Sequence, residues 1–318
     1  MSNQDSSHIG LIIVLSIFIG LYLFILIIIH CFGKINNIIF PAPAPMYQEQ
    51  DFEDQLHFAC IYNQDGNLGK TKINIVNGKP IDYSQNLEKV RSIPYVYIKN
   101  KYSETNLHLI YFHGNAEDVY AGAQFMECLM KMINANIFVI EYPGYGIYRN
   151  IQTTSNLVEQ DSLALYDEIK IKFKLNDDQI YIFGRSIGTG PSFYLASQRN
   201  IKGLITMSAY KSIRDIVGDF CYGCGCILNI ICCLPNFFRN LERSQEVKCP
   251  IVMIHGLDDT LIKFHHSQEI FLNLPYDIQQ QSKIFLKPRM THNDYDIEDD
   301  IANSILEGFM ELKQKKFH

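Results

Sequence analysis

The sequence predicts an α/β domain whose mostly parallel central sheet is covered by helices on both faces, preceded by one membrane-spanning helix. Six apolar, β-rich runs recur between residues 107 and 287, helical stretches separate them, and a long apolar run precedes the domain. Each run is continuous in apolar character, as strands that are buried on both faces require. The six runs read LHLIYF, NIFVIEY, QIYIFG, GLITMSA, PIVMIHG and KIFLK.

Three earlier runs, HFACIY, TKINIV and IPYVYIK, precede this alternation of strands and helices. We expect them to form antiparallel strands at the edge of the sheet. In open sheets of this class, functional side chains gather in the loops at the carboxyl ends of the strands. We therefore expect the functional residues in those loops.

Residues 9–32 (IGLIIVLSIFIGLYLFILIIIHCF) contain no Lys, Arg, Asp or Glu. This run is longer than the roughly 20 residues that a helix needs to cross a bilayer. The preceding MSNQDSSH has no basic residue, whereas a cleaved signal peptide would begin with one. We expect residues 1–8 to be an N-terminal tail and residues 9–32 to be a single-pass anchor, with the lipid bilayer as its partner.

Lys34, just after this run, favours a cytosolic position for the rest of the chain under the positive-inside rule. The odd number of cysteines, 9, and the lack of any N-x-S/T acceptor agree with a cytosolic location. Prolines at positions 41, 43 and 45 predict a stiff spacer over residues 33–57, and the folded domain is expected over residues 58–318.

The composition fits this organisation and excludes one class of function. A chain of 318 residues that is 47% hydrophobic can bury the core of one large domain. The net charge is −6 and no basic block occurs, so the sequence predicts no binding of nucleic acid.

The stretch YIFGRSIGTGP places Ser186 between Gly184 and Gly188, where a predicted strand turns into a predicted helix. A G-x-S-x-G turn is typical of a nucleophilic serine, because the glycines let the backbone pass close to itself and the hydroxyl points out of the sheet. The same stretch also fits a serine that only caps the helix. The nucleophilic interpretation therefore needs a base and an acid elsewhere in the chain.

A serine becomes nucleophilic when a histidine takes its proton and a carboxylate orients that histidine; in this architecture the chain order is serine, acid, histidine. His292 follows the run KIFLK by a short loop and is the predicted base. The acid is expected in the loop LDDTLI, where Asp258 and Asp259 both qualify. His265 and His266 follow these acids too closely to serve as the base.

Ester hydrolysis also needs N–H donors directed at the developing oxyanion. Ile187 can supply one from its backbone, directly after the serine. The second is expected from the loop HGNAED, with Asn115 as the first choice and Ala116 as the alternative. His113 in the same loop precedes the serine in the chain, so we expect it to shape the loop.

The pieces HGNAED, EYPGYG, YIFGRSIGTGP, IHGLDDTLIKFHHS and THND lie between about residues 107 and 294. Together they resemble the α/β-hydrolases, and within them the membrane-tethered hydrolase-domain proteins that include protein depalmitoylases. The resemblance implies that Ser186 is the nucleophile and His292 the base. It also implies that the acid is Asp259 rather than Asp258, because the family's acid stands three residues after the HG pair.

The resemblance further implies hydrolysis of an acyl ester or thioester through an acyl-serine, without metal or organic cofactor. Depalmitoylases of this branch carry an acylated, cysteine-rich N-terminus, whereas this chain has the apolar run there. The prediction is a membrane-anchored serine hydrolase, an acyl-protein thioesterase whose substrates are S-acylated proteins. The alternatives are an esterase of acyl lipids, such as lysophospholipid or monoacylglycerol, and a catalytically silent hydrolase fold that serves as a membrane scaffold.

A cysteine-rich insert is predicted at about residues 216–240, between the runs GLITMSA and PIVMIHG. A zinc site is disfavoured there, because no histidine is near in the sequence and no second C-x-x-C follows at usable spacing. Small apolar cysteines that pack a buried helix are the favoured interpretation. The functional alternative is an apolar cap that touches the bilayer and is S-acylated. The cysteines are Cys221, Cys224, Cys226, Cys232 and Cys233.

Overall fold

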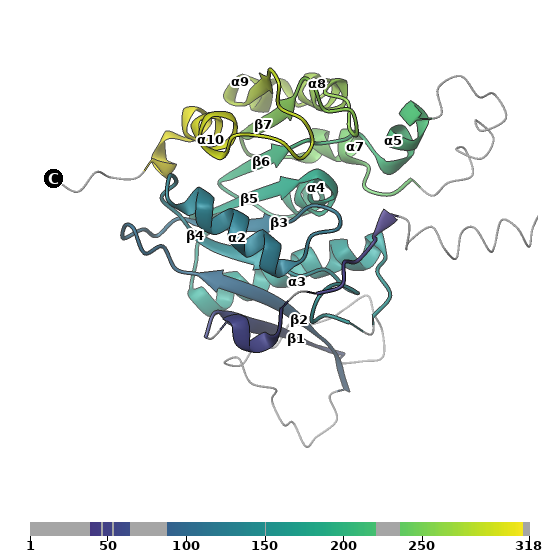
Figure 1. Cartoon of the computed structure of the whole chain (residues 1–318). Coiled ribbons are helices and arrows are strands. Elements are labelled where there is room, and N and C mark those ends of the chain that lie inside the picture. Colours follow the sequence, from purple (N-terminus) through teal and green to yellow (C-terminus); the bar gives the residue numbers. More distant parts are fainter. Residues whose placement is uncertain are drawn as a thin grey trace, which may run out of the picture. The chain divides into compact units, whose positions relative to one another are not determined.

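The computed structural model describes residues 39–313, except residues 46, 53, 64–87, 150 and 221–235. The chain divides into two units, Met1–Pro41 and Ala42–His318, and the second contains the sheet and the helices labelled in Figure 1. The expected tail and anchor, residues 1–32, lie outside the described residues. Among the residues that are described, no helix is both long enough and apolar enough to cross a membrane.

Within the described residues, eight strands form one sheet in the order β1-β2-β4-β3-β5-β6-β7-β8 (Figure 1). β2 pairs antiparallel with β1 and β4, and all other neighbouring pairs are parallel. The strands are β1 (Leu56–Asn63), β2 (Glu88–Ile98), β3 (His108–Phe112), β4 (Asn136–Ile140), β5 (Ile180–Arg185), β6 (Gly203–Met207), β7 (Ile251–Gly256) and β8 (Lys283–Lys287).

This sheet confirms the mostly parallel arrangement that the sequence predicts. Each of the six apolar runs overlaps one of the strands β3 to β8, and HFACIY and IPYVYIK overlap the antiparallel strands β1 and β2. The run TKINIV lies outside the described residues. Because the parallel strands share one direction, their following loops meet at one edge of the sheet.

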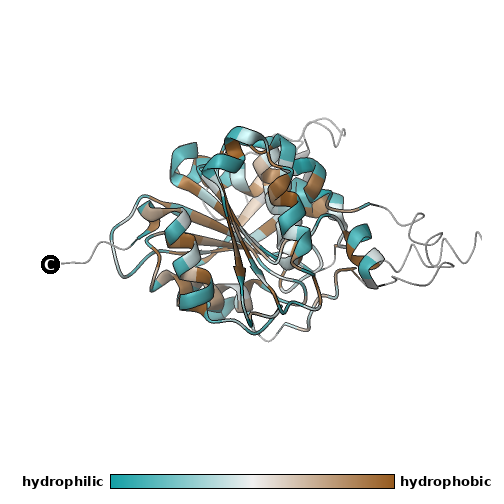
Figure 2. Ribbon diagram, turned by 90° about the horizontal axis from the view of Figure 1, so that it is seen from above, coloured by the Kyte–Doolittle hydropathy of each residue, from teal (hydrophilic) through white to brown (hydrophobic). Residues whose placement is uncertain are grey.

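Helices cover both faces of the sheet, as Figure 2 shows from above. α2 and α10 pack on one face around a shared apolar cluster, and α3 and α4 contact each other on the opposite face. Their bounds are α2 (Val119–Met130), α3 (Ser155–Phe173), α4 (Thr189–Gln198), α5 (Ile213–Phe220), α7 (Asn240–Arg243), α8 (His265–Leu272), α9 (Tyr276–Gln281) and α10 (Asn303–Gly308), with a π-helical turn, η5 (Ile297–Ala302), before α10.

The central strands are buried along their whole length. Every residue of β3, β4, β5, β6 and β7 is buried, whereas β8, at the edge, is partly exposed. The strands are accordingly the most hydrophobic part of the domain in Figure 2. Each fully buried large apolar side chain contributes roughly 1.5–3 kcal/mol to stability. The sheet is therefore a rigid base for the loops that follow its strands.

The folded unit begins upstream of residue 58, the predicted domain boundary. Tyr47 and Phe52, which the sequence analysis places in the spacer, are both buried in the core. The Tyr47 hydroxyl donates to Glu141 Oε2 at 2.8 Å and accepts from the Ile147 N–H at 3.1 Å. The nearby prolines predict an extended spacer, in which both aromatic rings would be exposed to water. Burial of the two rings in the core is more favourable, so this segment packs onto the domain.

Glu168 on α3 is a buried acid that stability measurements can detect. Its side chain is fully buried, and neither carboxylate oxygen has a hydrogen-bond partner among the described residues. Burial raises the pKa of Glu168 to about 7, although the nearby Lys172 opposes that rise. The unfolded chain loses this proton near the ordinary value of 4.5, so native stability falls as pH rises from about 4.5 to 7.

Glu168→Gln is therefore expected to stabilise the protein by about 2 kcal/mol at pH 8 and to have little effect at pH 4.5. Urea unfolding at both pH values measures the difference. Glu159→Gln, on the same helix, is the control: Glu159 forms an ion pair with Arg243 at 2.7 Å, so its loss should not stabilise. A gain for Glu168→Gln that is equal at both pH values would contradict the titration argument.

Candidate active site

The turn after β5 has the geometry that a nucleophilic serine needs. β5 ends at Arg185, and Ser186 has a φ of +52°, a left-handed conformation that is strained for a residue with a side chain. The chain then makes one 3-10 turn and enters α4 at Thr189. A Cβ on Gly184 would stand 2.6 Å from the Gly188 carbonyl oxygen, so the turn closes only with glycine there.

Gly188 packs the turn directly against the loop after β3. A Cβ built on Gly188 would stand 2.2 Å from the Phe112 carbonyl oxygen and 2.7 Å from that of His113. These are backbone atoms, which cannot move aside as a side chain can. The serine turn and the HGNAED loop are therefore held in backbone contact.

Gly188→Ala is expected to destabilise the domain by roughly 3 kcal/mol, because the new methyl group overlaps two backbone carbonyls. For a domain of this size that loss lowers the melting temperature by about 10 °C, which thermal unfolding measures. The matched control is Gly218→Ala in α5, where an added Cβ meets nothing within 4 Å. Equal melting temperatures for the two variants would contradict the packing argument.

The structure brings Ser186, His292 and Asp259 together from three separate loops. His292 Nε2 lies 3.0 Å from the Ser186 hydroxyl oxygen, and His292 Nδ1 lies 2.8 Å from Asp259 Oδ2. The three loops follow β5, β8 and β7, all at the carboxyl edge of the parallel sheet. One hydrogen-bond chain therefore connects a serine hydroxyl to a carboxylate through an imidazole.

The surroundings of Asp259 hold its carboxylate in the ionised state. Burial alone would raise its pKa, but hydrogen bonds from His255 and His292 hold the pKa of Asp259 well below its usual range. Asp259 Oδ1 also accepts from the backbone N–H groups of Leu261 at 3.0 Å and Ile262 at 2.8 Å. The neighbouring Asp258, the other acid that the sequence allowed, is exposed.

The sequence analysis missed His255, which supports the acid from behind. Its ring is fully buried, with Nε2 3.5 Å from Asp259 Oδ2 and 2.8 Å from the Ile262 carbonyl oxygen. His255 Nδ1 lies 2.6 Å from the Ser267 hydroxyl. A histidine inside an otherwise apolar strand is the sequence signal for this role, but the search by chain order does not reach His255, because it precedes the acid.

The loop that carries His292 is fastened to the loop that carries the acid. The Asp258 N–H donates to the Met290 carbonyl at 3.2 Å, and the Leu257 N–H donates to that of Lys287 at 2.9 Å. A Cβ on Gly256 would stand 2.0 Å from the Met290 carbonyl oxygen, so the two loops lie in direct backbone contact there. The acid and the base are thus positioned as one unit.

The two predicted oxyanion donors lie on the two segments that Gly188 holds together. Ile187 directly follows the serine in the 3-10 turn. Asn115 lies in the loop after β3, where its Oδ1 accepts from the Tyr145 hydroxyl at 3.0 Å and from the Ala116 N–H at 3.1 Å. Ala116 has a φ of +56°, which makes a sharp bend in this loop.

His113 is fully buried beneath that loop. Its Nδ1 lies 3.0 Å from the Gly114 carbonyl oxygen, and its Nε2 lies 3.3 Å from Glu141 Oε1. Nδ1 thus faces the backbone of the HGNAED loop, and Nε2 faces the carboxylate of Glu141, which directly follows β4. These contacts fit the loop-shaping role that the sequence analysis expects.

A second cluster of ionisable side chains, Asp219, His265 and His266, has ligand atoms within 4.8 Å of one another. Burial lowers the pKa of His266 to about 4, and its Nδ1 accepts from the Lys211 backbone N–H at 3.3 Å. In the neutral ring this contact leaves the proton on Nε2, the atom that faces Asp219, whereas a metal would need that lone pair. The cluster therefore fits a polar contact between a neutral histidine and a carboxylate, joining α5 and α8, better than a metal site.

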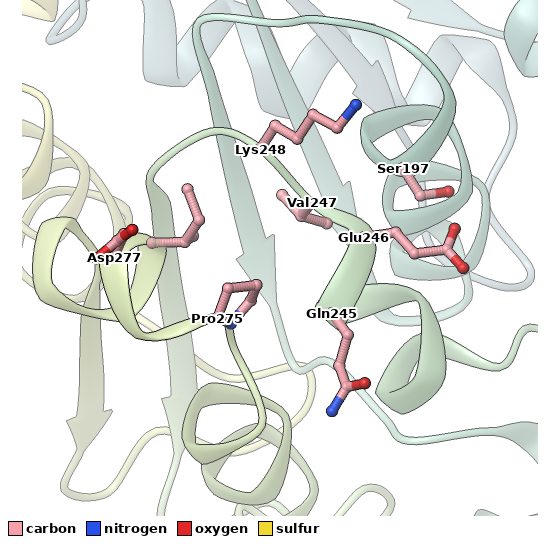
Figure 3. A pocket seen from close by; sticks show the side chains of 8 residues that line it. Ser197, Gln245, Glu246, Val247, Lys248, Pro275 and Asp277 are labelled. Atoms are coloured by element: carbon pink, nitrogen blue, oxygen red, sulfur yellow. The ribbon is translucent and has the colours of Figure 1, made fainter.

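A further pocket, whose lining side chains Figure 3 shows, has a volume of about 530 Å³. Lys248 lines it shortly before β7, whereas Asp259 follows β7, so the pocket and the acid stand at opposite ends of that strand. Six residues of strand span roughly 20 Å. This pocket is therefore separate from the candidate active site. It is lined by Ser197, Gln245, Glu246, Val247, Lys248, Pro275, Asp277 and Ile278.

Solved structures share this fold. An esterase from Pyrococcus furiosus superposes with a TM-score of 0.57 over 86% of this chain and 97% of its own, at 14% identity. A cold-adapted esterase from an Arctic intertidal metagenomic library superposes with a TM-score of 0.51 over 82% of this chain and 96% of its own, at 15% identity. At such identities the likeness shows the fold alone.

Curated relatives are closer in sequence. The alpha/beta hydrolase domain-containing protein aho-3 of Caenorhabditis elegans is 30% identical over 59% of this chain and 53% of its own length. The putative alpha/beta hydrolase L404 of Acanthamoeba polyphaga mimivirus is 31% identical over 57% and 66% of the two chains. The human alpha/beta hydrolase domain-containing protein 17B is 29% identical over 51% and 54%.

The chain belongs to the α/β-hydrolases. No protein-family model matches it. This α/β-hydrolase spans about half to two thirds of the length of the curated relatives it matches. The relatives and the fold support hydrolase chemistry, and the triad geometry above shows where in this α/β-hydrolase that chemistry can occur.

Proposed function

We propose that this α/β-hydrolase is a membrane-anchored, cytosol-facing serine hydrolase that cleaves acyl thioesters on S-acylated proteins. The observation that carries the proposal is the hydrogen-bond chain from Ser186 through His292 to Asp259. Each member has the environment that its role needs. Ser186 lies in a tight, strained turn, the imidazole of His292 contacts both the serine and the acid, and the carboxylate of Asp259 is buried and ionised.

In the acylation step, His292 Nε2 accepts the proton of the Ser186 hydroxyl while the oxygen attacks the acyl carbonyl carbon. The oxyanion that forms is stabilised by the backbone N–H of Ile187 and by Asn115, or by Ala116 in its place. The tetrahedral intermediate then breaks its carbon–sulfur bond. His292 returns the proton to the departing cysteine thiolate, which leaves an acyl-serine ester.

In the deacylation step, a water molecule donates a proton to His292 Nε2 and attacks the acyl-serine carbonyl. Collapse of the second intermediate releases the fatty acid, and the proton returns from His292 to the Ser186 oxygen. Asp259 keeps the imidazole in one orientation and stabilises its positive charge in both steps. These residues complete the cycle with water as the second substrate.

The choice of a thioester substrate rests on the resemblance to the depalmitoylase branch and on the relatives above, which include human protein 17B. The membrane anchor rests on residues 9–32, whose composition predicts a bilayer-spanning helix. Confinement to a bilayer raises the local concentration of lipidated substrates, so an anchor suits this chemistry.

The experiment compares the purified full-length chain on four substrates: a palmitoylated peptide, lysophosphatidylcholine, monoacylglycerol and a p-nitrophenyl ester. We expect the highest kcat/KM on the palmitoylated peptide. A preference of tenfold or more for either lipid would replace the thioesterase proposal with an acyl-lipid esterase. No turnover of any substrate, together with no labelling of Ser186 by a fluorophosphonate, would instead indicate a silent scaffold.

A further inference from the structure

Arg185, the residue before the serine, is oriented across the site. It ends β5, and only 7% of its surface is exposed. Its Nη2 donates to the His292 carbonyl oxygen at 3.2 Å and to Asn293 Oδ1 at 2.9 Å. The guanidinium also lies over the Tyr295 ring, 5.5 Å from its centroid. One end of the guanidinium is thus attached to the histidine loop.

The other end of the guanidinium is attached to the loop that carries the predicted oxyanion donor. Arg185 Nη1 forms an ion pair with Glu117 Oε1. The second oxygen of the same carboxylate, Oε2, accepts from the Gly114 backbone N–H at 2.9 Å. Gly114 directly precedes Asn115 in the HGNAED loop. Glu117 therefore connects the arginine to the backbone next to the donor.

We propose that Arg185 and Glu117 form a positioning pair that sets the distance between the imidazole of His292 and the oxyanion donors around Ser186. This inference rests on the proposed function. Neither residue touches the hydroxyl or the acid; both act through the backbone of the loops they hold. The planar guanidinium suits this task, because its separate N–H groups reach two loops in one fixed geometry, which a lysine ammonium cannot do.

Misplacement of a catalytic group by about 1 Å can cost on the order of 100-fold in rate without loss of substrate binding. We therefore expect Arg185→Met to lower kcat for a p-nitrophenyl ester by 10- to 100-fold and to change KM by less than about threefold. Arg185→Lys keeps the charge but reaches one loop at a time, so its kcat should lie between those of the wild type and Arg185→Met.

The deciding measurement is a double-mutant cycle with Glu117→Gln. If the two residues act as one pair, Glu117→Gln should lower kcat in the wild type and have almost no further effect in Arg185→Met. The matched control is Arg199→Met. Arg199 also forms a two-point ion pair, with Asp167 at 2.9 Å, but it lies at the end of α4 away from the site, so kcat should not change.

A kcat for Arg185→Met within twofold of the wild type, or additive effects of the two substitutions, would overturn the inference. If Arg185→Met does not fold, as circular dichroism would reveal, Glu117→Gln and Arg185→Lys provide the same comparison. Failure of the proposed function is distinguishable, because the wild type itself would then neither hydrolyse the ester nor react with a fluorophosphonate at Ser186.

Discussion

Ser186→Ala is expected to lower the rate of ester and thioester hydrolysis by roughly 10⁴- to 10⁶-fold. The substitution removes the oxygen that lies 3.0 Å from His292 Nε2, and no other atom of the turn can form an acyl intermediate. The melting temperature should change by only a few degrees, because alanine and serine have similar volumes. Steady-state kinetics on the palmitoylated peptide, with fluorophosphonate labelling, measures the effect.

Ser197→Ala is the matched control for this variant. Ser197 lies on the helix that follows the turn, and its hydroxyl donates to the Tyr194 carbonyl at 2.8 Å within that helix. It also lines the separate pocket of Figure 3, so an unchanged rate would show that hydrolysis does not depend on this pocket-lining hydroxyl. Turnover that persists in Ser186→Ala would refute the assignment of the nucleophile.

Asp259→Asn is expected to lower kcat by roughly 10³- to 10⁴-fold. Its amide can still accept, through Oδ1, from the Leu261 and Ile262 backbone N–H groups, so the loop should keep its shape. The new NH₂ group would face His292 Nδ1 and donate to it, which moves the imidazole proton to Nε2. An imidazole protonated at Nε2 cannot accept the proton of Ser186.

The control is Asp258→Asn, which removes a charge one residue away. Asp258 is exposed, and the carboxylate that His292 Nδ1 contacts is that of Asp259, so kcat should stay within about twofold of the wild type. The free energy of unfolding gives a second readout for Asp259. Because its pKa is lowered in the native state, the ionised carboxylate stabilises that state above about pH 4, and this contribution is lost as the pH falls further. Equal kinetics of the two variants would contradict the choice of Asp259 as the acid.

Much of this fold was predictable because its strands are buried on both faces. Runs such as LHLIYF are apolar on both faces of the strand, because neither face meets water. An unbroken apolar run therefore predicts a central strand directly. The turn at Ser186 was predictable for a similar local reason, since the glycines on either side allow a backbone contact that no other residue permits. Chain order then predicted His292 in the loop after β8 and Asp258 or Asp259 in the loop after β7, and the resemblance to the family chose Asp259.

The rest depends on contacts between segments far apart in the chain. Tyr47 is part of the core because its hydroxyl meets Glu141, 94 residues later, and nothing near Tyr47 in the sequence signals that partner. The same holds for Arg185, whose partners lie on the loops after β3 and β8. The predicted anchor and the five cysteines of the insert lie outside the described residues, so both stay predictions.

The order of the strands has a consequence for synthesis. The ribosome makes Ser186 more than a hundred residues before His292, and the imidazole reaches the hydroxyl only once β8 has joined β7 at the edge of the sheet. A nascent chain that ends before β8 therefore has the serine but not yet its base. The catalytic hydrogen-bond chain can therefore form only after the ribosome has passed β8 and the loop that carries His292.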